Sequence, residues 1–216
     1  MEKLKGIIFD LDGTLLDTIE DISNAVNSAL IEYGLKPHKI EDYKYFVGDG
    51  IEQLVERALG KEIKKEKFNE IFSKIKENYG KNWNIKTKPY PYIPEMLDEL
   101  KKKNVKMAVV SNKPHKFTEL TIKYYFGRKY FDPIYGASEN YPKKPDPFLA
   151  YKVLENFNLS QNEVAYLGDS NTDVLFAKNA GILPLGAAWG FRGVKELEEN
   201  GAQYIIQNPL EILEFF

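Results

Sequence analysis

Between residues 18 and 83, apolar residues recur at spacings of three and four, the spacing of one face of an α-helix. Thr18 is a plausible N-cap for the first stretch, Asp21 follows three residues later, and Gly34 is a plausible stop. No convincing strand pattern interrupts this region, so the spacing predicts three helices. The apolar positions that define them are Ile19, Ile22, Val26, Ala29, Leu30 and Tyr33, then Ile51, Leu54, Val55, Ala58 and Leu59, then Phe68, Ile71, Phe72, Ile75 and Tyr79.

From about residue 90 onward, short apolar runs alternate with stretches of helical spacing, and one more apolar run, GIIFDLD, begins at residue 6. Strands that alternate with helices imply right-handed crossovers and a parallel sheet covered on both faces. The pattern therefore predicts an α/β fold with a Rossmann-like sheet. We expect strands in 6–12, 105–110, 132–137, 163–169 and 182–188, helices in 95–103, 115–126, 147–157 and 171–181, and helix, strand, helix in 194–216.

The same pattern predicts two domains. Residues 1–17 and 84–216 would form the sheet domain, and residues 18–83 a small α-helical domain inserted after the first strand. A chain of 216 residues, 43% of them hydrophobic, is long enough for one core domain and a smaller insert.

Composition excludes several classes of protein. The chain has no cysteine, which rules out disulfides, thiolate nucleophiles and cysteine-rich zinc sites. Its net charge of -2 argues against a dedicated nucleic-acid binder. No apolar run approaches the roughly 20 residues that span a membrane. We therefore expect a cytoplasmic protein that binds neither nucleic acid nor membrane.

Polar and acidic residues stand at the carboxyl ends of three predicted strands, where open α/β sheets bind their ligands. These residues are Asp10 and Asp12 after GIIF, Ser111 and Asn112 after VKMAVV, and Asp169, Ser170 and Asp173 after EVAYLG. The strand ends therefore predict one shared site.

The acidic residues have two interpretations. Asp10 and Asp12 would point to the same side if the strand reached that far, and Gly13 would permit a sharp exit. They could equally form an acidic turn, and Asp169 or Ser170 could be an ordinary N-cap. Alternatively, Asp10, Asp169 and Asp173 could share one Mg²⁺ ion, for which carboxylate oxygens are suitable ligands.

Three further segments each have a functional and a purely structural interpretation. Ser111 and Asn112 before Pro114 suit either a helix cap or an anion site built on free main-chain N–H groups. Lys143 or Lys144, held by the proline-braced turn KKPDP, could neutralise a phosphate or remain an exposed surface lysine. The loop Gly48-Asp49-Gly50 is either a substrate contact or a simple turn between helices.

Four segments together resemble the motifs of the haloacid dehalogenase superfamily of phosphotransferases, in the family's order. They are DLDGT at 10–14, VVSN at 109–112, KKPDP at 143–147 and GDSNTD at 168–173. The helical insert matches the family's cap, which lies between its first and second motifs. Within the superfamily, FVGDGIEQLVERAL and the tail WGFRGVKELEENGAQYIIQNPLEI are most similar to phosphoglycolate phosphatases.

The resemblance implies a role for each residue. Asp10 would attack phosphorus, and Asp12 would be the general acid and then the base. The lysine before Pro-x-Pro, Lys144, would neutralise the phosphate. The other implied roles are Mg²⁺ ligation by Asp10, Asp169 and the Asp12 carbonyl, support of the metal or Lys144 by Asp173, phosphate binding by Ser111 and Asn112, and support of the first loop by Thr14.

The implied function is a Mg²⁺-dependent phosphatase of a small phosphorylated metabolite, 2-phosphoglycolate first. A pyrophosphatase and a sugar-phosphate phosphatase or phosphomutase are the alternatives. The presence of Asp12 disfavours C–halogen and C–P cleavage, because the family's enzymes for those reactions lack an aspartate there. A non-catalytic binder is disfavoured because Asp10, Asp12, Lys144 and Asp169 are all present. We expect a monomer or homodimer.

Overall fold

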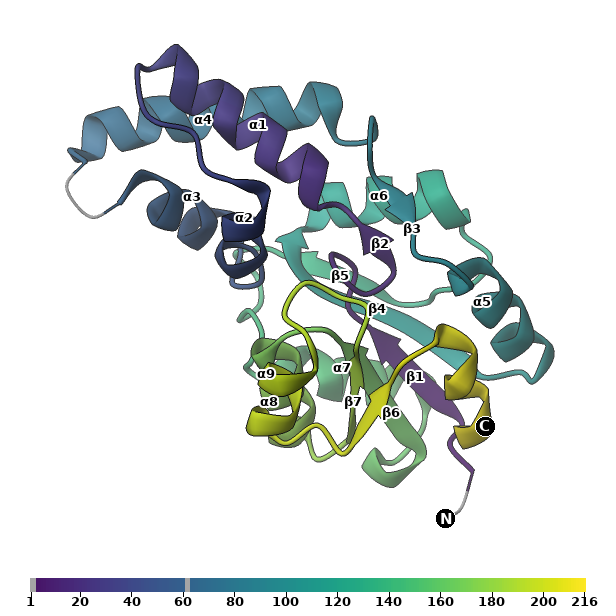
Figure 1. Ribbon diagram of the computed structural model, residues 1–216. Coiled ribbons are helices and arrows are strands. Elements are labelled where there is room, and N and C mark those ends of the chain that lie inside the picture. Colours follow the sequence, from purple (N-terminus) through teal and green to yellow (C-terminus); the bar gives the residue numbers. More distant parts are fainter. Residues whose placement is uncertain (1–2, 61–62) are drawn as a thin grey trace.

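Six parallel strands form the central sheet in the computed structural model, which describes residues 3–60 and 63–216 (Figure 1). Their spatial order is β5-β4-β1-β6-β7-β8, so β1 lies inside the sheet between β4 and β6. This confirms the predicted α/β fold. The strands are β1 (Gly6–Phe9), β4 (Lys106–Pro114), β5 (Ile134–Ala137), β6 (Val164–Gly168), β7 (Leu183–Ala187) and β8 (Tyr204–Ile206).

Helices cover both faces of the sheet because its central strands are apolar on both sides. Along β1, Ile7 and Phe9 pack into one core and Ile8 into the other, as alternation along a strand requires. The first core includes side chains of α5 (Ile93–Lys102), α6 (His115–Phe126) and the 3-10 helix η2 (Pro209–Phe215). The second includes α7 (Phe148–Phe157) and α8 (Asn171–Ala180), and α9 (Val194–Asn200) packs against α8. A 3-10 turn, η1 (Gln161–Glu163), precedes β6.

Four helices lie together beyond the carboxyl ends of the strands (Figure 1). They share a third hydrophobic cluster, to which Phe191 from the loop after β7 also belongs. They are α1 (Ile19–Glu32), α2 (Ile40–Phe46), α3 (Ile51–Leu59) and α4 (Lys65–Asn82), and we call them the cap helices. Three of them match the predicted stretches. The short α2 was not predicted, because only Tyr43 of its seven residues is buried.

The predicted domain boundaries remain a prediction, and residues 1–2 and 61–62 within them lie outside the described part of the chain. None of the helices that the structure describes is both long and apolar enough to cross a membrane.

The cap helices join the sheet through a two-stranded antiparallel ribbon of β2 (Leu16–Asp17) and β3 (Lys88–Pro89), which the apolar pattern does not reveal. Asp21 in the first turn of α1 secures the returning chain. Its buried carboxylate accepts hydrogen bonds from the main-chain N–H groups of Lys86 and Thr87 and from the Thr87 hydroxyl, at 2.8–3.0 Å.

Three local predictions need correction. β4 does not end at Val110 but continues with a register shift through Ser111, Asn112 and Lys113. Thr18 occupies the N-cap position of α1 but makes no capping bond with its side chain, and Asp21 faces the returning chain instead. The last helix is a 3-10 helix, which begins at Pro209.

We predict that Asp21→Ala lowers the free energy of unfolding by about 2–3 kcal/mol, because it leaves the main-chain N–H groups of Lys86 and Thr87 without their acceptor. Urea denaturation checks this. Glu20→Ala is a matched control in the same helical turn, where the side chain is exposed, and we expect it to cost less than about 0.5 kcal/mol. Equal losses in the two variants would contradict the role of Asp21.

Candidate active site

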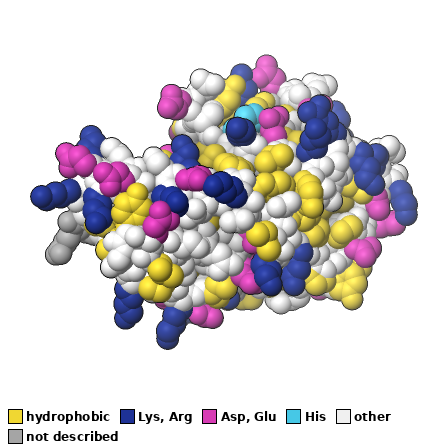
Figure 2. All heavy atoms as spheres, turned by 90° about the horizontal axis from the view of Figure 1, so that it is seen from above, with side chains coloured by type: hydrophobic (Ala, Val, Ile, Leu, Met, Phe, Trp, Pro, Cys, Tyr) yellow, Lys and Arg dark blue, Asp and Glu magenta, His cyan; other side chains and the backbone are white. Residues whose placement is uncertain are grey.

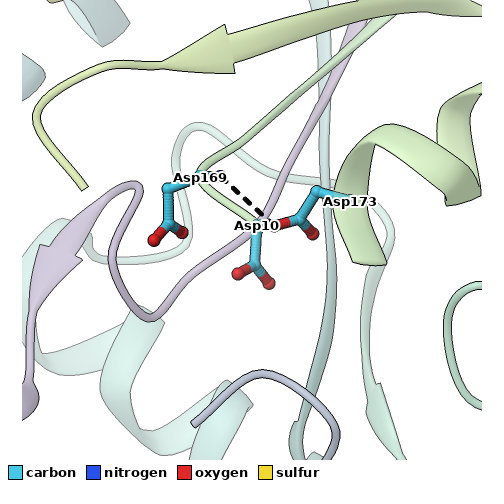
Figure 3. Close-up of side chains that lie close together, drawn as sticks. All are labelled: Asp10, Asp169 and Asp173. Carbon is cyan, nitrogen blue, oxygen red and sulfur yellow. Dashed lines mark hydrogen bonds between the residues drawn. The ribbon is translucent and has the colours of Figure 1, made fainter. Parts of the chain in front are cut away.

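Three buried carboxylates meet at the carboxyl ends of β1 and β6. Asp10 follows β1, Asp169 follows β6, and Asp173 lies in the first turn of α8 (Figure 3). One ligand oxygen of each lies within 4.8 Å of the other two. β1 and β6 are neighbours in the sheet, so its topology brings together residues about 160 positions apart.

Lys144 supplies positive charge to this group. Its Nζ lies 2.8 Å from Asp10 Oδ1 and 2.6 Å from Asp173 Oδ1, and it also donates to the Tyr166 hydroxyl. Its side chain is only 2% exposed, so both ion pairs are shielded from solvent. The structure thus distinguishes the two lysines of KKPDP, because Lys143 turns away and pairs with Glu52 of α3.

Asn112 holds the Lys144 segment in place. Its Oδ1 accepts from the Lys144 N–H at 2.9 Å, and its Nδ2 donates to the Lys144 carbonyl at 3.1 Å and to the Gly48 carbonyl at 3.0 Å. The Asn112 side chain therefore joins β4, the proline-braced turn and the cap helices.

Burial changes the acidity of the group. It raises the pKa of Asp10 to about 6, although Lys144 opposes the shift and Asp173 adds to it. Burial, with repulsion from Asp173 and Asp10, also raises the pKa of Asp169 well above its usual range. Burial works against the charge of Lys144, but Asp10 and Asp173 outweigh it and raise the pKa of the lysine.

These carboxylates fit a hard divalent cation. All three offer oxygen ligands, which Mg²⁺ prefers. A cation would offset both the burial and the mutual repulsion that raise the pKa values of Asp10 and Asp169. Asp173 is partly committed elsewhere, because its Oδ2 accepts from the N–H groups of Asp169 and Ser170 and from the Ser170 hydroxyl. Ser170 is the N-cap of α8, so the capping and site interpretations of this loop hold together.

The loop after β1 wraps closely around Asp169. Thr14 Oγ1 donates to Asp169 Oδ1 at 3.0 Å, and the Phe191 N–H donates to Oδ2 at 2.8 Å. Gly13 has φ +90°, and a Cβ there would lie 2.4 Å from the Asp169 carboxylate; at Gly190 it would lie 2.1 Å from Asp169 Cβ. Gly13 therefore requires glycine for its positive φ and for the close approach, and Gly190 requires it for the close approach.

Asp10 and Asp12 border the same cavity but have different partners. β1 ends at Phe9, so the extended strand that would set both side chains in parallel does not reach them. Asp12 instead pairs with Lys113, whose Nζ lies 2.9 and 3.1 Å from the two carboxylate oxygens.

The cavity lies between the strand ends and the cap helices. The empty space there is about 690 Å³ when the open mouth of the cavity is included. Ser111, Asn112 and Lys113 of β4 line the sheet side together with the two aspartates. The cap side is lined mainly by apolar residues, namely Ile22, Ala25, Val26, Val47, Ile51, Leu54 and Ile75.

In the loop Gly48-Asp49-Gly50, the two glycines border the cavity and the Asp49 side chain has other partners. Gly48 and Gly50 line the cavity at the start of α3. The Asp49 carboxylate instead accepts from Thr172 Oγ1 of α8 at 2.9 Å and pairs with Arg57. A substrate contact by Asp49 stays a prediction, and in this arrangement the side chain links the cap helices to the sheet domain.

Several site residues have a weak signal or none in the sequence. Lys113 stands two positions after Ser111 on a buried strand, which is unusual for lysine and could have marked it. Tyr79 and Tyr166, which both contact site lysines, lie in ordinary apolar helix and strand patterns and could not be distinguished from core residues.

Charged side chains of both signs are interspersed over the face seen from above (Figure 2), which shows no broad area of one sign. The charges that matter to the site are instead the buried ones between the two layers, in two lysine–aspartate groups.

Comparisons with known proteins agree with this geometry. The model of the haloacid dehalogenase-like hydrolase family matches residues 7–187. A phosphoglycolate phosphatase of Psychrobacter arcticus is 32% identical over 97% of this chain and 91% of its own, and one of Aquifex aeolicus is 36% identical over 87% and 86%. A crystal structure from Haemophilus somnus, described as a predicted phosphoglycolate phosphatase, superposes with a TM-score of 0.93 at 27% identity and covers 99% of this chain and 98% of its own.

We predict that millimolar Mg²⁺ raises the melting temperature more at pH 7.5 than at pH 5. Because the pKa values of Asp10 and Asp169 are raised, the folded site retains protons that the unfolded chain releases, so stability falls as pH rises through this range. At pH 7.5, Mg²⁺ binds the ionised carboxylates and restores the stability that their deprotonation costs. At pH 5 it must displace protons from them, so the increase in melting temperature is smaller. Differential scanning fluorimetry measures both shifts.

Asp169→Asn should remove the Mg²⁺-dependent shift, whereas Asp98→Asn, on the exposed side of α5, should retain it. A shift of the same size at both pH values, or one that survives Asp169→Asn, would place the ion elsewhere.

Proposed function

Because the chain belongs to the haloacid dehalogenase-like hydrolase family and is a phosphoric monoester hydrolase, we propose that it hydrolyses 2-phosphoglycolate through an aspartyl-phosphate intermediate. One observation supports this most strongly. The nucleophile candidate Asp10 lies beside the buried Lys144 and the carboxylates of Asp169 and Asp173. Asp10 and Asp12 both border the cavity. The names of the two relatives and of the superposed crystal structure support the choice of substrate.

In the first step, an oxygen of Asp10 attacks phosphorus and the bond to the leaving oxygen breaks. Asp12 gives its proton to that oxygen, so the leaving oxygen becomes the neutral hydroxyl group of glycolate. Lys144, 2.8 Å from Asp10, offsets the repulsion between the carboxylate and the phosphate dianion. Ser111 and Asn112 line the cavity wall, where the Ser111 hydroxyl and the Asn112 main chain would hold phosphate oxygens.

In the second step, Asp12 accepts a proton from water as the water oxygen attacks phosphorus, and Asp10 is released. Asp10, Asp169 and the Asp12 carbonyl would hold Mg²⁺, with Asp173 in support. When bound, this ion would add positive charge against the phosphate oxygens. The cap helices exclude bulk water while both steps occur.

The cavity suits a small leaving group. Its cap side is largely apolar, and it offers few hydrogen-bonding side chains for the hydroxyls of a sugar. The N-terminal end of α3 borders the cavity at Gly50 and Ile51, where the helix dipole favours an anionic group such as the glycolate carboxylate.

We predict that kcat/KM for 2-phosphoglycolate exceeds that for pyrophosphate and for hexose phosphates by about tenfold or more, because the mainly apolar cap side of the cavity discriminates by size and polarity. A panel assay of released phosphate with Mg²⁺ measures this. A higher kcat/KM for pyrophosphate or a sugar phosphate would show that 2-phosphoglycolate is not the preferred substrate. Dependence of the activity on a sugar bisphosphate would indicate a phosphomutase.

We predict that Asp10→Asn lowers turnover of p-nitrophenyl phosphate by about 10⁴-fold or more, because an amide cannot replace the nucleophilic carboxylate. Asp146→Asn, on the exposed KKPDP turn, is the control and should retain activity. If Asp10→Asn retained full turnover in a preparation free of host phosphatase, Asp10 would not be the nucleophile.

A further inference from the structure

Lys113 is a buried cation that the mechanism above does not use. Its side chain is 4% exposed, and its three ammonium hydrogens have three acceptors within reach. Two are the Asp12 oxygens, at 2.9 and 3.1 Å, and the third is the Tyr79 hydroxyl, at 2.6 Å. Lys113 therefore connects the proposed acid–base residue to cap helix α4.

Stability alone does not account for this arrangement. A buried ion pair gains little net free energy, because removing two charges from water offsets much of their attraction. An apolar side chain could fill the same space at the wall of a mainly apolar cavity. What the pair provides is geometry, since two hydrogen bonds to one carboxylate fix both its position and the plane of its oxygens.

The two buried lysines serve separate aspartates. Lys144 contacts Asp10 and Asp173 on the nucleophile side, whereas Lys113 contacts Asp12 on the cap side. Tyr79 is itself held, since its ring packs edge-on against Phe117 of α6 at 5.1 Å between centroids. The position of the Asp12 carboxylate thus depends on β4 and on α4 together.

We propose that Lys113 is a positioning residue that holds the Asp12 carboxylate at the leaving-group side of the cavity, with Tyr79 fixing Lys113 from the cap. This rests on the proposed function. As the bond from phosphorus to the leaving oxygen breaks, the proton of Asp12 moves to that oxygen. The negative charge left on Asp12 then lies beside the ammonium group, which keeps its own protons.

Leaving-group dependence tests the proposal without reference to the natural substrate. Phenyl phosphate has a basic leaving oxygen that needs a proton, whereas 2,4-dinitrophenyl phosphate does not. We expect Lys113→Met to lower kcat/KM for phenyl phosphate by about 30-fold or more and for the dinitrophenyl ester by less than about 3-fold. Tyr79→Phe should show the same selectivity with a smaller loss, and Lys113→Arg should recover part of the activity.

A double-mutant cycle identifies the residue through which Lys113 acts. Asp12→Asn should also affect phenyl phosphate selectively, and adding Lys113→Met to it should cost less than about 2-fold more. Lys116→Met replaces an exposed lysine of the adjacent helix and should leave both substrates unaffected. Melting temperatures of each variant confirm that the protein is folded.

Equal losses on both esters, or losses by Lys113→Met and Asp12→Asn that multiply in the double variant, would overturn the proposal. Failure of the proposed function has a different signature. The wild-type protein would then hydrolyse neither ester, or Asp12→Asn itself would lose equally on both, and either result overturns the role of Lys113 as well.

Discussion

The buried contact between Lys144 and the carboxylates of Asp10 and Asp173 is the interaction on which the site depends. Three acidic groups within 4.8 Å of one another repel strongly in the interior, and removing this one ammonium would leave their charge uncompensated. The lysine is therefore anchored at several points: its main chain by Asn112, its side chain by Tyr166, and its turn by prolines on both sides of Asp146.

The order of strands determines which residues can meet that lysine. β1 lies between β4 and β6, so the loops after these three strands open at the same edge of the sheet. The strand ends contribute different chemical groups: carboxylates after β1 and β6, and hydroxyl, amide and ammonium groups along the end of β4. The cap helices cover this edge, and their hydrophobic cluster reaches the sheet domain at Phe191, so the cavity forms between two layers that touch beside it.

Much of this could be predicted from the sequence, because periodic apolar patterns reflect which faces are buried. Such patterns predict the strands that precede Asp10 and Asp169 and the helices that contain Ile22 and Ile71. The rest depends on contacts distant in sequence. α2 is short and mostly exposed, the β2–β3 ribbon spans two residues on each side, and the tyrosines beside the lysines resemble any core aromatic. The choice of Lys144 over Lys143 needed the family's motif, and the structure supports it through Asp10.

The ribbon of β2 and β3 means that the chain passes between the layers only at one edge of the cap helices. Figure 1 places α2 and α3 away from this edge. There the contacts to the sheet domain include hydrogen bonds, such as Asn112 to the Gly48 carbonyl and Arg192 to the Val47 carbonyl, and the packing of Phe191. Each such hydrogen bond contributes only about 1 kcal/mol net, whereas the two chain connections that run through the ribbon are covalent. A rotation of the cap helices about the β2–β3 ribbon would therefore first break the hydrogen bonds beside the cavity mouth.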